Sequence, residues 1–83
     1  MTEHNIAVPD LYAAAFLIAH ELPVLRIDAG GRLPGQIQFV FDRMQAAPLL
    51  DSYQRGGGVN GLKYAAAIRY VKHAIHHEKR GQR

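Results

Sequence analysis

The chain has no cysteine and no tryptophan among its 83 residues, and its only serine and threonine are Ser52 and Thr2. The lack of cysteine excludes disulfide bonds, thiolate zinc sites, iron–sulfur clusters and cysteine nucleophiles. Ser52 stands beside Asp51 in a helical segment. A serine at such a position is explained by local hydrogen bonding of its hydroxyl group and need not be a nucleophile. We therefore expect neither an enzyme nor a bound cofactor.

Long hydrophobic runs are also lacking. The longest nearly uninterrupted apolar run covers residues 11–19, whereas a helix needs about 20 apolar residues to span a bilayer. Residues 1–9 contain Glu3 and no lysine or arginine, so the positive start of a secretory signal is missing. We expect a cytoplasmic protein that is not associated with a membrane.

The composition is that of a globular protein, with 48% hydrophobic and 20% charged residues. A chain of this length buries only about 60–65% of its unfolded surface, which leaves room for one small domain. We expect an N-terminal arm over residues 1–8, a single domain over residues 9–79 and a basic C-terminal tail over residues 80–83.

The first half of the chain changes its hydrophobic period. Apolar residues at helical spacing follow Pro9 and end before Pro23, which predicts a first helix. Alternating residues over 23–28 and 36–41 then predict two strands, and the turn residues between them predict a hairpin with a long loop over 29–35. Because two strands alone are marginally stable, the hairpin must pack against helices.

The second half predicts two further helices. Asp42 is a good cap for the first of them, but Pro48 interrupts its pattern, so we favour a short helix from Pro48 that follows a turn. Gly56, Gly57 and Gly58 end this helix and predict a flexible joint. Asn60 then caps a final helix over residues 61–79. The predicted fold class is a small α+β domain in the order α-β-β-α-α.

Several short motifs in this order are similar to those of a known family. The first motif is the DLY segment Asp10, Leu11 and Tyr12, followed by Ala14, and the second is the FVFD segment Phe39, Val40, Phe41 and Asp42. Tyr53 before a glycine break is the third. The last is a closing helix with Tyr64, Ala67, Val71 and Lys72. Together they resemble an uncharacterised family of short prokaryotic and phage-borne proteins over about residues 8–75. The resemblance implies the order of elements and no activity. The glycine triplet and the histidine-rich end lie outside the pattern.

Phosphate-loop and metal chemistry are poorly supported. The glycine-rich segments 30–35 and 56–61 lack the closing Lys-Ser/Thr pair of a phosphate loop. His73 and His77 lie four residues apart on a helix and could chelate one ion, but Glu78 is the only further ligand nearby and lies on a different face. We expect no metal site.

Charge is distributed unevenly along the chain. Residues 1–51 carry three arginines against six acidic residues, whereas residues 52–83 carry seven lysines or arginines against one glutamate. An acidic body with a basic end is compatible with an anionic partner, with head-to-tail association or simply with solubility.

The final helix gathers most of this basic charge on one side. Opposite its apolar stripe stand Arg69, Lys72, His73, His76 and Arg80, with Lys79 at the margin. Such a face can contact successive phosphates, although no aromatic residue interleaves it to stack on single-stranded bases. Binding of nucleic acid is therefore one hypothesis, and a merely solvated helix face is the alternative.

The first helix supplies the other hypothesis. It is apolar on nearly all sides, so it must be covered on more than one side by its own domain or by a second subunit. We favour a non-catalytic interaction module that forms a homodimer, or binds another protein, with Tyr12, Phe16 and Leu17 at the contact. An accessory nucleic-acid-binding protein is the alternative.

Overall fold

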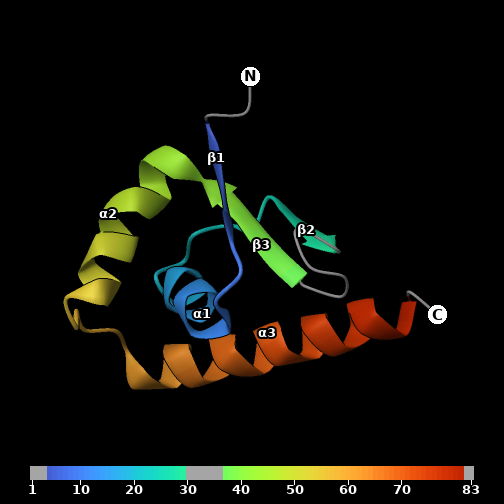
Figure 1. Ribbon diagram of the computed structural model, residues 1–83. Helices are drawn as coiled ribbons and strands as arrows, with labels where there is room; N and C mark the ends of the chain where they lie inside the picture. The colour runs from blue at the N-terminus through green and yellow to red at the C-terminus, as the bar shows by residue number, and fades with distance from the viewer. Residues whose placement is uncertain (1–3, 30–36, 82–83) are drawn as a thin grey trace.

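The computed structural model describes residues 4–29 and 37–81, and it is an α+β domain of three helices and one three-stranded sheet (Figure 1). In chain order the elements are β1 (Asn5–Val8), α1 (Leu11–Ala19), β2 (Arg26–Ala29), β3 (Ile37–Asp42), α2 (Arg43–Gln54) and α3 (Gly61–Gly81). The predicted fold class and the order of the five predicted elements are confirmed. Among the described residues, no helix is both long enough and apolar enough to cross a membrane.

The sheet is antiparallel, with β3 in the centre and β1 and β2 at its edges. Phe39 lies opposite Val8 of β1 and Ile27 of β2, which places apolar side chains of all three strands in one row. Ile37, Phe39 and Phe41 are buried, as expected of one face of a strand with a period of two. The predicted hairpin is therefore confirmed, although its first strand is displaced toward the C-terminus. The rest of the loop predicted over 29–35 lies outside the described residues.

The N-terminal arm predicted over residues 1–8 is wrong for Asn5–Val8, because these residues form β1. The residues of β1 do not alternate, since three apolar side chains follow Asn5, and the partner strand β3 is distant in the sequence. At the other end, the tail predicted from residue 80 begins two residues too early, since α3 continues to Gly81.

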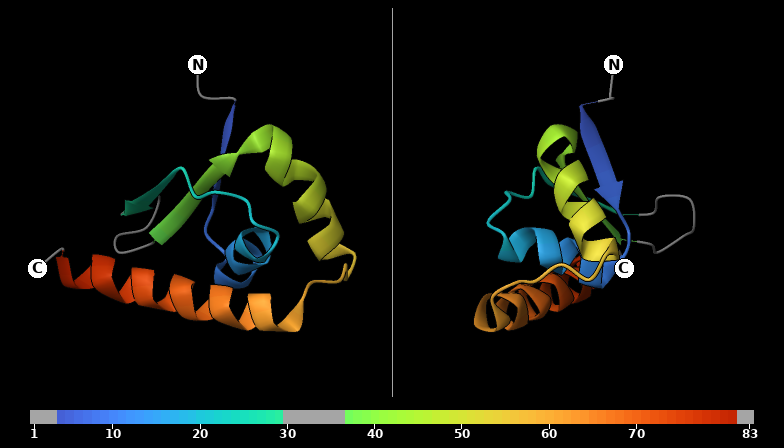
Figure 2. Two further views of the ribbon diagram at one scale, coloured as in Figure 1. Left: turned by 180° about the vertical axis from the view of Figure 1, so that it is seen from behind. Right: turned by 90° about the vertical axis from the view of Figure 1, so that its left-hand side faces the viewer.

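Helix α1 is the centre of the molecule. In the views of Figures 1 and 2 it lies between the sheet and α3, and α2 closes one side. Asp10 begins the helix by accepting hydrogen bonds from the backbone N–H groups of Tyr12 and Ala13, at 2.9 and 3.3 Å. The five consecutive residues 13–17 are all buried. Because 3.6 residues complete a turn, this helix is covered on every side by its own chain.

Helix α2 begins earlier than predicted, at Arg43 rather than at Pro48. The carboxylate of Asp42 accepts a hydrogen bond of 3.0 Å from the backbone N–H of Gln45, which caps the helix at that point. Pro48 is tolerated inside the helix because it lies on the exposed side, where water can bind the carbonyl group left without a donor.

The end of α2 explains two of the three consecutive glycines. The N–H of Gly56 donates to the carbonyl of Tyr53 and the N–H of Gly57 to that of Ser52, which together form a Schellman motif. Gly56 has a φ of 81°, a left-handed conformation that favours glycine. A Cβ atom at Gly57 would lie 1.9 Å from Ser52 Oγ. The segment expected to be a flexible joint therefore begins as a hydrogen-bonded helix end.

Gly56 and Gly58 should respond differently to replacement by alanine. Gly56→Ala should lower the free energy of unfolding by about 1 kcal/mol, because alanine is strained at positive φ. Gly58→Ala should leave stability unchanged or raise it by up to about 1 kcal/mol, since Gly58 has no positive φ and open space around it. Urea denaturation of both variants measures the difference, and equal stabilities would contradict the structural role of Gly56.

Candidate functional site

The orientation of α3 is fixed at its first turn and along its inner side. Asn60 Oδ1 accepts a hydrogen bond of 3.0 Å from the backbone N–H of Lys63, which confirms the predicted cap. The side chains packed on the core recur at helical spacing, as predicted, and comprise Tyr64, Ala67, Ile68, Val71, Ala74 and Ile75. With this stripe turned inward, the opposite side of the helix faces solvent.

The outer side of α3 carries the predicted basic residues. Arg69, Lys72, His73 and His76 are all exposed, and we call these four residues the basic face. The side chains of Lys79 and Arg80 lie outside the described part of the structure. Within the described part, no carboxylate forms an ion pair with Arg69 or Lys72. The basic face thus presents positive charge that no described carboxylate neutralises.

The acidic residues behave in the opposite way, because each described carboxylate already has a local partner. Asp10 and Asp42 cap helices, as the sequence suggested, and the other three accept from basic side chains, in the pairs Asp28 with Arg26, Asp51 with Arg55 and Glu21 with Lys63. These pairs are exposed, so each contributes little to stability. Their effect is electrostatic, because the basic partner in each pair compensates the negative charge of the carboxylate beside it.

The predicted self-association residues are mostly internal. Phe16 is only 2% exposed and Leu17 is fully buried, so the proposed contact through these two side chains is wrong. The Phe16 ring packs against His20 and Tyr53, with ring centroids 4.6 and 5.2 Å apart. The sequence showed that α1 needs covering on several sides, but its own sheet, α2 and α3 supply the cover.

Tyr12 differs from these two residues because its side chain is half exposed. Its backbone carbonyl accepts a hydrogen bond of 3.3 Å from the hydroxyl of Tyr64, which joins the start of α1 to α3. Burial raises the pKa of Tyr64 above its ordinary value, so this hydroxyl stays protonated as a donor. Tyr12 therefore marks a structural junction between the two helices.

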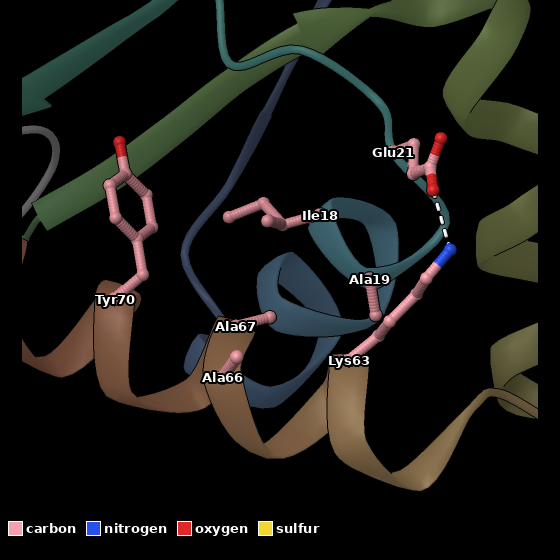
Figure 3. A pocket seen from close by; sticks show the side chains of 7 residues that line it. All are labelled: Ile18, Ala19, Glu21, Lys63, Ala66, Ala67 and Tyr70. Atoms are coloured by element: carbon pink, nitrogen blue, oxygen red, sulfur yellow. Dashed lines mark hydrogen bonds and ion pairs between the residues drawn. The ribbon is translucent and has the colours of Figure 1, made fainter.

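An open pocket of about 330 Å³ lies where the end of α1 meets α3 (Figure 3). Its lining consists of Ile18, Ala19 and Glu21 on the α1 side, and of Lys63, Ala66, Ala67 and Tyr70 on α3. The base of the pocket is apolar because three of these residues are alanines. Figure 3 shows the ion pair between Glu21 and Lys63 at one end and the ring of Tyr70 at the other.

Glu21 occupies an unusual backbone position at the end of α1. The N–H groups of Glu21 and Leu22 donate to the carbonyls of Ile18 and Leu17, which forms a second Schellman motif. Glu21 has a φ of 68° at the position that usually holds glycine. Its hydrogen bond with Lys63, followed by the lysine charge, lowers its pKa. No motif in the sequence indicated this residue, since the helix was expected to end nearer Pro23.

His73 and His77 lie on the exposed side of α3, and within the described ranges no group of three or more ligand-type side chains forms a metal site.

The chain matches no protein-family model, and neither the curated proteins nor the solved structures contain a match to it. The resemblance to the short prokaryotic and phage-borne family therefore stays a prediction.

Two variants separate the backbone strain at Glu21 from its ion pair. Both Glu21→Gly and Glu21→Gln remove the charge, but only glycine relieves the positive φ, so Glu21→Gly should be more stable than Glu21→Gln by about 1 kcal/mol. Urea denaturation at neutral pH provides the measurement. Two equal stabilities would contradict strain at this position.

The ion pair itself predicts a pH dependence. Because the pKa of Glu21 is lower in the folded chain than in the unfolded chain, the contribution of the pair is present at neutral pH and is lost as the pH falls through the lowered pKa. The small stability difference between wild type and Glu21→Gln should therefore vanish in acid.

Proposed function

We propose that this protein is a small non-catalytic module that binds nucleic acid through the basic face of α3. The observation that supports the proposal is the contrast in charge between the basic face and the rest of the described chain. Within the described residues, Arg69 and Lys72 are exposed and have no carboxylate partner, whereas every described carboxylate is already capped or paired. A phosphate backbone supplies anions that these two cations can bind.

The spacing of the basic face suits a continuous row of phosphates. Arg69, His73 and His76 follow one another at intervals of four and three residues, so they lie along one side of the helix, and Lys72 lies beside them. Helix geometry places Arg69 and His76 about 10 Å apart along the axis. A helix of this width also fits the major groove of duplex DNA.

The same face argues for weak and sequence-tolerant binding. Among its four residues there is no asparagine or glutamine to read adenine edges, and the arginine is single. The exposed ring of Tyr70 lines the pocket and is not one of the residues of the basic face, so stacking of single-stranded bases is not favoured. The proposal is therefore limited to contacts with the backbone of a duplex.

Salt dependence tests the proposal directly. Affinity for a random-sequence DNA or RNA duplex should fall as salt rises, with a log–log slope of roughly −0.9 for each phosphate contacted on DNA and about three or four contacts in all. Fluorescence anisotropy measures this slope. The double variant Arg69→Glu with Lys72→Glu should lose binding while it keeps its fold, because both side chains point away from the core.

A matched control separates the basic face from net charge. Arg26→Glu with Arg55→Glu makes the same change in charge at two exposed arginines on other elements. This control should bind much more tightly than the variant of the basic face. If wild type and both double variants bind equally poorly at about 50 mM salt, where such contacts are strong, the proposal is wrong.

A further inference from the structure

The first half of α3 presents an exposed apolar side chain next to an unfilled pocket. Leu62 is 85% exposed, more than any other large hydrophobic residue of the described chain. One turn further along the helix, Ala66 lines the pocket of about 330 Å³ at the end of α1. The pocket remains open because Ala19, Ala66 and Ala67 have side chains too small to fill it (Figure 3).

A patch that contains both a protruding side chain and a matching hollow is self-complementary. A two-fold symmetric interface requires this property, because the same surface must fit itself after rotation. We propose that a second copy of this chain docks on the patch, with α3 of the two copies antiparallel and Leu62 of each copy in the pocket of the other. The patch consists of Leu62, Lys63, Ala66, Tyr70 and Glu21.

The charges of the patch favour a second copy as its occupant. Glu21 and Lys63 lie at the rim as one negative and one positive group. A surface with a single sign of charge would repel its own copy. In an antiparallel dimer, by contrast, Glu21 of one copy faces Lys63 of the other, and the reverse. The patch is thus electrically as well as sterically complementary to itself.

The antiparallel arrangement also separates the remaining charge. Leu62, Lys63 and Ala66 precede the basic face along α3, although Tyr70, the last residue of the patch, follows Arg69. Antiparallel pairing centred on residues 62–66 therefore directs the two basic faces toward opposite ends of the dimer. The proposal does not rest on nucleic-acid binding, since the patch and the basic face are defined by different residues.

The oligomeric mass tests this proposal. By light scattering and sedimentation equilibrium, wild type should approach twice the 9.2 kDa of one chain as its concentration rises toward about 1 mM. Leu62→Glu should weaken the dimer by about a hundredfold, because each dimer then lacks two buried leucines. Ala66→Phe should do the same by filling the pocket from within its own chain.

Met44→Glu is the matched control, because Met44 is also a strongly exposed apolar residue, at 78%, but lies on α2. It should dimerise like wild type, and circular dichroism should show that all three variants are folded. A wild type that stays at 9.2 kDa overturns the proposal, as does a dimer that tolerates both Leu62→Glu and Ala66→Phe, or one that Met44→Glu also dissociates.

A small apolar ligand is the competing occupant of the pocket. The fluorescent probe 8-anilinonaphthalene-1-sulfonate distinguishes it. A monomeric wild type that binds this probe, with binding kept in Leu62→Glu and lost in Ala66→Phe, overturns the dimer in favour of a ligand pocket.

Discussion

Burial of α1 on all sides is the constraint on which the rest of the structure depends. Four of its nine residues are alanines, which bury little area each, so the helix needs cover on several sides to be stable. The sheet supplies a layer whose buried face carries Phe39 and Phe41, and α3 supplies the opposite layer with Ala67 and Val71. Helix α2 closes a side through the contact of Tyr53 with Phe16. The arrangement of α2, α3 and the sheet follows from the need to surround α1.

The sequence predicted the elements whose signals are local. The cap Asn60 and the inward stripe of α3 depend on residues within a few positions of one another, and both were found where the pattern placed them. The strand β1 was missed because its evidence is a partner far along the chain. Pro48 misled the prediction because the penalty for proline inside a helix is smaller where its surroundings are exposed.

The candidate sites show the same limit. The basic face follows from helical spacing and charge, so its exposed residues could be named in advance. The pocket could not, because it arises where the end of α1 crosses α3 and depends on three small side chains from two distant segments. For the same reason Phe16 was misplaced. An all-round apolar helix indicates that cover is needed, but only the tertiary structure shows that the chain provides it.

The position of α1 between early and late parts of the chain has a consequence for synthesis. As the chain leaves the ribosome, α1 emerges near the beginning, but its sheet layer waits for β3 and its other layer waits for α3, the last element. Contacts of this long sequence separation slow folding, because the intervening loops must close before the contacts form. The nascent chain therefore carries an uncovered apolar helix until α3 has left the ribosome. Folding should be a single cooperative event once α3 is available, and a chain that lacks α3 would expose α1 to aggregation or degradation.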